Sequence, residues 1–252
     1  MPFVTAGGHR LEHERIDGDA ARPTLVLLHE GLGSVALWRD FPAKLAHATG
    51  APLVVYSRHG YGQSEALAAP RTPRYMHDEA LVVLPELRRA LGLKDVVLVG
   101  HSDGASIALI HAGSGRWPVR ALVLEAPHVF VEDVSIASIA AAREAYATTD
   151  LRQRLQRYHA DVDSAFRGWN DAWLDPAFRE WNIAAYLPGV RCPVLAIQGE
   201  GDEYGTLAQI AAIEGGVKGR FEKLVLGGCK HTPHRDQERV VLHAMAAFVA
   251  TV

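Results

Sequence analysis

A serine between two glycines is the residue whose setting points most clearly to chemistry. Residues 100–104 read Gly-His-Ser-Asp-Gly and place Ser102 at the centre of a G-x-S-x-G pattern. An apolar run, residues 95–99, precedes it, and residues 105–110 after it have helical character. A buried strand, a tight turn and a helix lift a serine hydroxyl above the edge of a sheet. The context predicts a nucleophile elbow, and with it an enzyme.

A serine hydroxyl is a weak nucleophile and needs a base, which in turn needs an orienting carboxylate. In parallel sheets, reactive groups gather in the loops that follow strands. Asp202 follows the apolar run 193–197, and His231 follows the run 221–226. We therefore expect Ser102, His231 and Asp202 to form a catalytic triad, in the chain order Ser, Asp, His.

Other acids and another histidine compete for these roles. Glu200 and Glu203 flank Asp202, and Glu125 ends an earlier apolar run. Asp202 is preferred because its offset past the strand suits the tip of a loop. His234 competes with His231, but it lies beyond Pro233 at the start of the last predicted helix.

The oxyanion of an acyl-transfer intermediate needs backbone N–H donors. One donor should be the N–H of Asp103, which follows the nucleophile, and the second should come from the loop after the strand at residues 24–28. That loop, residues 29–34, reads His-Glu-Gly-Leu-Gly-Ser, and we expect Gly31 to be the donor. The alternative is that these glycines form a plain turn.

Buried apolar runs alternate with helical segments along most of the chain, which predicts a mostly parallel sheet with helices on both faces. Residues 131–187 break this alternation. They contain no good strand and hold Trp169, Trp173 and Trp181. We therefore expect an α/β core formed by residues 1–130 and 188–252, and a helical lid at 131–187.

The chain resembles the α/β-hydrolase family of serine hydrolases over about residues 24–251. The resemblance rests on the histidine loop at 29–34, an Arg-Gly-x-Gly-x-Ser-like turn at 58–64, the elbow, and the acid and histidine loops. It implies the α/β-hydrolase fold and cleavage of a carboxylic ester or related acyl bond. Cleavage of a carbon–carbon bond and lactone opening are alternatives on the same triad. A ligand receptor or a lyase on this scaffold is an alternative of another class.

Four positions depart from the usual family pattern. Glu30 stands where glycine is usual, and Leu32 stands where proline is common. His59 interrupts the arginine-glycine turn, and Asp103 stands where methionine, leucine or glutamine is commoner. The Ser-Asp-Gly elbow is similar to that of the valacyclovir hydrolase (biphenyl hydrolase-like) branch. That similarity implies that Asp103 binds an amino group of the substrate.

The two carboxylates of Glu30 and Asp103 should lie close to the oxyanion hole. They would repel an anionic substrate, so we expect neutral or cationic substrates to be preferred over diacids. The alternative is that Glu30 pairs internally with Arg39 or Arg58.

Further residues are expected to line the substrate pocket. His101 and His128 lie near strand ends, and Trp169 lies in the predicted lid. The tryptophans of that segment can equally pack the lid against the core.

Composition excludes several other classes of protein. The 252 residues carry a net charge of −3 and no basic stripe, which gives no support for nucleic-acid binding. No apolar run is long enough for a membrane span or a signal peptide, and the two cysteines suit a reducing compartment, so we expect a cytoplasmic protein.

Cofactor motifs are also missing from the sequence. There is no G-x-G-x-x-G and no P-loop, so no nucleotide cofactor is expected. Residues 9–13 match the zinc-protease pattern H-x-x-E-H, but the flanking glycines predict a hairpin instead of a helix, so no metal is expected. The expected partner is a small-molecule substrate, and the sequence says nothing about the oligomeric state.

Overall fold

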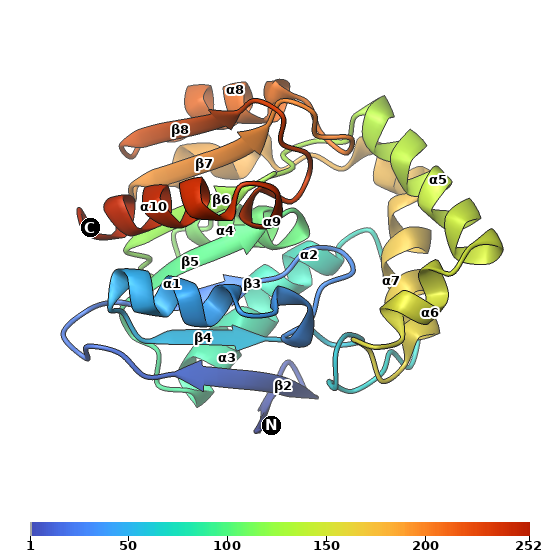
Figure 1. The fold of residues 1–252 in the computed structure, drawn as a ribbon, viewed down its shortest axis with the longest axis horizontal. Helices are drawn as coiled ribbons and strands as arrows, with labels where there is room; N and C mark the ends of the chain where they lie inside the picture. Colours follow the sequence, from blue (N-terminus) through green and yellow to red (C-terminus); the bar gives the residue numbers. More distant parts are fainter. Residues whose placement is uncertain (1) are drawn as a thin grey trace.

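An eight-stranded sheet forms the centre of the structure, a computed structural model that describes residues 2–252 (Figure 1). The strand order is β1-β2-β4-β3-β5-β6-β7-β8. β1 and β2 form an antiparallel hairpin, β2 pairs antiparallel with β4, and the remaining neighbours are parallel. The strands are β1 (Phe3–Ala6), β2 (His9–Ile16), β3 (Thr24–Leu28), β4 (Leu53–Tyr56), β5 (Val96–His101), β6 (Ala121–Glu125), β7 (Val194–Gly199) and β8 (Phe221–Leu226).

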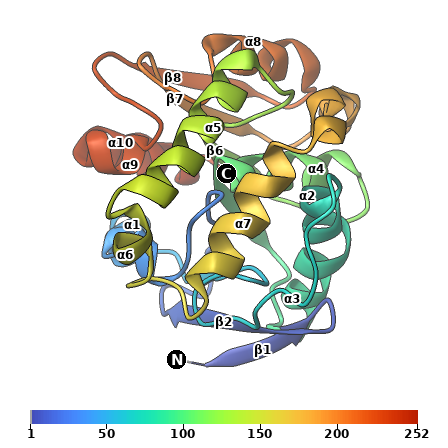
Figure 2. The same ribbon diagram turned by 90° about the vertical axis from the view of Figure 1, so that its right-hand side faces the viewer.

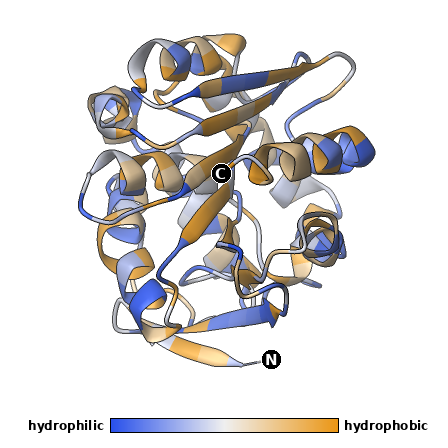
Figure 3. Ribbon diagram, turned by 90° about the vertical axis from the view of Figure 1, so that its left-hand side faces the viewer, coloured by the Kyte–Doolittle hydropathy of each residue, from blue (hydrophilic) through white to orange (hydrophobic). Residues whose placement is uncertain are grey.

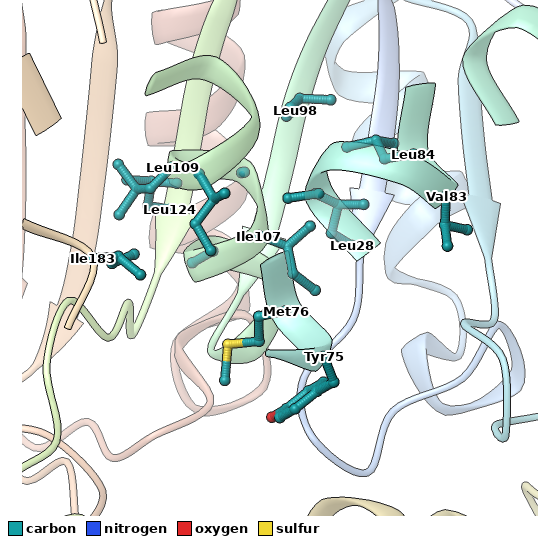
Figure 4. Packing of buried hydrophobic residues seen from close by; sticks show 14 of the residues in the cluster. Leu28, Tyr75, Met76, Val83, Leu84, Leu98, Ile107, Leu109, Leu124 and Ile183 are labelled. Atoms are coloured by element: carbon teal, nitrogen blue, oxygen red, sulfur yellow. The ribbon is translucent and has the colours of Figure 1, made fainter. Parts of the chain in front are cut away.

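The central strands are continuously apolar because helices cover both faces of the sheet. Every residue of β4, β5, β6 and β7 is buried. Figure 4 shows Leu28, Leu98 and Leu124 from three neighbouring strands near Ile107 and Leu109 of the helix that follows the elbow. Figure 3 shows hydrophobic colours along most of the central strands. The sheet edge β8 is more polar, with several exposed residues.

Two groups of helices enclose the sheet (Figure 1). One face is covered by α1 (Phe41–Thr49), α9 (Pro233–Asp236) and α10 (Glu238–Val249), with the short η1 (Ala36–Trp38) beside them. The other face is covered by α2 (Tyr75–Asp78), η2 (Glu79–Val83), α3 (Leu84–Ala90), α4 (Asp103–Gly113) and α8 (Leu207–Gly216). None of the helices in the described part of the chain has the length and apolar character to cross a membrane.

Two long helical stretches are divided in the structure. The segment 75–91 consists of α2, the π-helical η2 and α3, and Pro85 lies in the first turn of α3. A proline cannot donate an N–H to the preceding turn, so the hydrogen-bond pattern changes there. The last predicted helix begins at Pro233 and is interrupted at Gln237, whose side-chain amide donates to the carbonyl of Gly227.

A helical insertion lies between β6 and β7. It contains α5 (Asp133–Thr148), α6 (Leu151–Leu155), α7 (Val162–Trp173), η3 (Pro176–Glu180) and η4 (Ala184–Gly189). Figure 2 shows α5 and α7 crossing one end of the sheet, the end to which the parallel strands point in Figure 1. The loops that follow β3, β5, β7 and β8 therefore meet beneath this insertion.

Candidate functional site

The turn around Ser102 has a backbone that few residues adopt. Ser102 has φ 54° and ψ −117°, one of three non-glycine residues with positive φ in the described chain. Two glycines make the close approach possible. A Cβ on Gly104 would lie 2.0 Å from the carbonyl oxygen of Leu28, and one on Gly100 would lie 2.4 Å from that of Gly104. The strand therefore meets α4 directly, and Ser102 is presented at the junction.

The structure brings Ser102, His231 and Asp202 together. His231 Nε2 lies 3.0 Å from Ser102 Oγ, and His231 Nδ1 lies 2.8 Å from Asp202 Oδ1. When Nδ1–H donates to the carboxylate, Nε2 keeps its lone pair and can accept the serine proton. The three side chains come from the loops after β5, β7 and β8, where the sequence placed them.

Asp202 is held by more than its histidine. Oδ1 also accepts the backbone N–H of Tyr204 at 2.8 Å, and Oδ2 accepts Nε2 of Gln198 at 2.7 Å. Burial raises the pKa of Asp202, but the hydrogen bond and charge of His231 outweigh this, so the pKa lies below its ordinary value. Asp202 therefore stays ionised at neutral pH. Sequence analysis missed Gln198 because a buried glutamine on a strand carries no motif.

The competing acid and histidine pair with each other. His234 Nδ1 lies 2.6 Å from Glu125 Oε2, and both side chains are buried. The His234 ring packs against Trp38 and Phe41, with centroid separations of 4.8 and 4.9 Å. Glu200 and Glu203, the other candidate acids, are exposed.

Hydrogen bonds to His29 and Arg58 hold the loop at residues 29–34 in place. His29 Nε2 accepts the backbone N–H of Arg58 at 3.0 Å, so Nδ1 carries the proton and donates to the carbonyl of Glu30 at 2.7 Å. The guanidinium of Arg58 donates to the same carbonyl at 2.8 Å. In the described chain, the N–H groups of Gly31 and Asp103 have no protein acceptor. Both N–H groups are thus free to bind an oxyanion.

The carboxylate of Glu30 faces His101, a partner that the sequence analysis did not name for it. Glu30 Oε2 lies 3.7 Å from His101 Nδ1, and its side chain keeps 22% of its surface exposed. Burial opposes ionisation of Glu30, but the nearby His101 ring, with a smaller effect from the charge of Arg235, holds its pKa well below the usual range. Arg58 contacts the carbonyl of Glu30 rather than its carboxylate.

The side chain of Asp103 lies away from the site. It is fully buried, and its carboxylate accepts the hydroxyl of Tyr75 at 2.6 Å and Nε1 of Trp173 at 3.2 Å, with the guanidinium of Arg58 at 3.5 Å. This placement differs from the expectation that Asp103 binds a substrate amino group. At the first position of α4, its N–H faces outward while its side chain packs beneath, where a buried charge needs several partners.

A cavity of about 320 Å³ opens above Ser102. Larger hollows exist on the surface, but this one contains both Ser102 and His231. Its walls combine residues of the loop at 29–34 and of the elbow with apolar side chains, which come mostly from the helical insertion. The lining residues besides Ser102 and His231 are Glu30, Gly31, Leu32, Leu37, His101, His128, Ile139, Leu155, Trp169, Trp173, Glu203, Tyr204, Thr232 and Arg235.

The surroundings of two wall residues, Trp169 and His128, are well defined. Trp169 stands over Gly31, so that a Cβ there would lie 2.2 Å from the indole Nε1. Burial lowers the pKa of His128 to about 3, which keeps its imidazole neutral at physiological pH.

The H-x-x-E-H segment lies in β2. Residues four apart on an extended strand are separated by about 13 Å, so His9 and His13 cannot ligate one ion. This pattern therefore gives no support for a zinc-protease site.

Part of the chain matches a known family and several curated proteins. Residues 23–138 match a family described as alpha/beta hydrolase fold. Over 102 residues the chain is 30% identical to sn-1-specific diacylglycerol lipase ABHD11 of Mus musculus, covering 40% of this chain and 32% of the lipase. The chain spans less than half the length of the first curated relatives that it matches.

Solved structures match the whole chain at low identity. The 2-hydroxy-6-oxo-6-phenylhexa-2,4-dienoate hydrolase of Rhodococcus sp. strain RHA1 has a TM-score of 0.82 at 16% identity, covering 99% of this chain and 98% of that one. The enol-lactonase of Burkholderia xenovorans LB400 has a TM-score of 0.76 at 19% identity, covering 99% and 100%. The elbow, the sheet order and these matches agree, and the chain has the α/β-hydrolase fold.

Proposed function

We propose that this protein is a serine hydrolase that cleaves a carboxylic ester, or a related acyl bond, of a small substrate. One observation carries the proposal: a continuous hydrogen-bonded relay runs from Ser102 through His231 to Asp202 at the floor of a cavity. The match of residues 23–138 to the alpha/beta hydrolase fold family supports the same proposal.

The geometry supports an acyl-enzyme mechanism. Ser102 Oγ attacks the carbonyl carbon while His231 Nε2 takes its proton, and Asp202 stabilises the resulting imidazolium. The carbonyl oxygen becomes an oxyanion that the N–H groups of Gly31 and Asp103 bind. His231 then protonates the leaving alcohol as the bond to it breaks. A water molecule, deprotonated by His231, releases the acid and restores Ser102.

The cavity indicates the size and charge of the substrate. A volume of about 320 Å³ lies at the lower end for ligand sites. We propose that residues 131–187 act as a lid, and that Trp169, His128, His101 and Glu30 contact the substrate. We propose that neutral or cationic esters are preferred over carboxylate-bearing ones, because the Glu30 carboxylate is partly exposed in the cavity while the His101 ring that pairs with it is buried. The two free cysteines, Cys192 and Cys229, support a cytoplasmic location.

The test is hydrolysis of a panel of p-nitrophenyl esters, amino-acid esters, lactones and ring-cleavage diketones. Ser102→Ala should lower kcat by about a millionfold and abolish labelling by a fluorophosphonate. Ser114→Ala, at the other end of α4, is the matched control. Unchanged turnover in Ser102→Ala would contradict the proposal, and faster turnover of a carboxylate-bearing ester than of its amino counterpart would contradict the charge preference.

The same panel separates the alternatives. Turnover confined to lactones or diketones would redirect the assignment within the same triad chemistry. A receptor would bind ligand without multiple turnover, and a lyase would release an aldehyde or ketone without consuming water.

A further inference from the structure

One buried imidazole joins two separate loops of the site. His101 precedes Ser102 at the end of β5, and its side chain is 1% exposed. Its Nε2 lies 2.7 Å from the backbone carbonyl of His231, to which it donates. Its Nδ1 faces Glu30 Oε2 at 3.7 Å. The ring therefore contacts both the loop that carries His231 and the loop at residues 29–34.

The surroundings of the ring favour its charged form. A neutral imidazole has one N–H, which the His231 carbonyl takes, so its Nδ1 would turn a lone pair toward the Glu30 carboxylate; a second proton on Nδ1 removes that repulsion. Burial lowers the pKa of His101, but the facing carboxylate of Glu30, with the charge of Glu125, outweighs this and raises it. The rings of His231 and His234 each lie 5.2 Å from its ring.

Other groups around the ring complete its environment. Trp38, from η1, packs at 6.3 Å and carries no charge. Glu125, from the end of β6, is engaged by His234 through Oε2, while its Oε1 is buried without a protein partner in the described chain. Arg235 lines the cavity on the far side of Glu30 and is exposed.

We propose that His101 and Glu30 act as a charge-paired positioning unit. The pair holds the loop at residues 29–34 against the loop that carries His231, and the charge of His101 neutralises the Glu30 carboxylate beside the developing oxyanion. The inference rests on the proposed serine hydrolase function. An uncompensated carboxylate at the position of Glu30 would oppose the negative charge of the intermediate. His101 compensates it, and its second N–H fixes the backbone of His231.

The pair also sets the response to pH. As pH rises through the pKa of His101, the imidazolium loses its proton. Arg235 is then the only cation left near Glu30 to offset its negative charge. The value of kcat should therefore fall on the alkaline side. Removing either member of the pair should abolish this alkaline decline.

A double-mutant cycle tests the pair. His101→Gln keeps a donor toward the His231 carbonyl but removes the charge, and kcat should fall about tenfold or more with little change in KM. Glu30→Gln keeps the shape and removes the opposing charge. In the Glu30→Gln background, adding His101→Gln should cost less than about threefold, because no charge remains to compensate.

Two further variants separate positioning from folding. His101→Phe lacks the donor, so its kcat should stay low in both backgrounds. His243→Gln, on the exposed side of α10, controls for loss of a histidine, and thermal melting checks that each variant folds. Equal losses from His101→Gln in both backgrounds, or an alkaline decline that persists in Glu30→Gln, would overturn the inference. Activity that survives Ser102→Ala would instead overturn the proposed function.

Discussion

At the scale of single residues, Asp202 shows how an acid is selected for its role. Three acidic residues, Glu200, Asp202 and Glu203, lie within four positions, and only Asp202 turns inward to His231. Gln198 occupies Oδ2, which leaves Oδ1 for the imidazole and for Tyr204. The carboxylate is therefore both ionised and fixed in direction.

Replacing Asp202 by asparagine should lower kcat by about ten-thousandfold. The new amide presents a donor to His231 Nδ1, which favours the tautomer that cannot accept the serine proton. Steady-state kinetics on the best ester of the panel measure the effect. Glu200→Gln and Glu203→Gln are matched controls that remove a neighbouring charge outside the relay. A loss in either control as large as that in Asp202→Asn would show that the acid has been misassigned.

At the scale of elements, the junction between β5 and α4 determines where the nucleophile lies. The strand and helix approach so closely that backbone atoms occupy the space where side chains of Gly100 and Gly104 would stand. The end of β3 takes part as well, since the carbonyl of Leu28 is the atom nearest to a Cβ on Gly104. Displacing this junction would move Ser102 and the backbone N–H of Asp103 together.

Gly104→Ala should destabilise the fold by about 1–3 kcal/mol and lower kcat, because the new Cβ overlaps the carbonyl of Leu28. Gly215→Ala is the matched control in the exposed part of α8, where a Cβ meets no atom within 4 Å. That control should stabilise by about 0.5–1 kcal/mol by restricting the unfolded chain. Urea unfolding measures both. Equal stability of the two variants would contradict the close-packing explanation.

At the scale of the whole molecule, buried neutral histidines make the fold sensitive to acid. His111 is buried in α4, where Nδ1–H donates to the carbonyl of Ala80 and Nε2 accepts from Arg88. Burial lowers the pKa of His111 to about 4, and burial lowers the pKa of His128 to about 3. The unfolded chain would protonate both residues near pH 6.5.

The free energy of unfolding should therefore fall as the pH drops from 6.5 to 4, because the unfolded state binds protons that the native state does not. His111 alone accounts for a contribution on the order of 3 kcal/mol, fully present above pH 6.5. Urea unfolding at several pH values should show that His111→Gln reduces the slope by about 1.4 kcal/mol per pH unit. His243→Gln is the matched control. A wild-type slope retained in His111→Gln would argue against this origin.

Local sequence determined the features that depend on short stretches of chain. The elbow around Ser102 needs only a strand, two glycines and a helix, and β3 to β7 can be recognised as apolar runs because each of these strands is buried. Asp202 and His231 could be placed because parallel strands end at one edge of the sheet, whatever the details of packing.

Only the tertiary structure determined which residues the charged side chains contact. Asp103 turns to Tyr75 and Trp173, Glu30 turns to His101, and Glu125 takes His234. Each choice joins segments far apart in the chain, and each satisfies a buried charge whose partners no local pattern specifies. Position along a strand can place a residue at the site, but the packing of distant elements determines whether its side chain faces the substrate or the core.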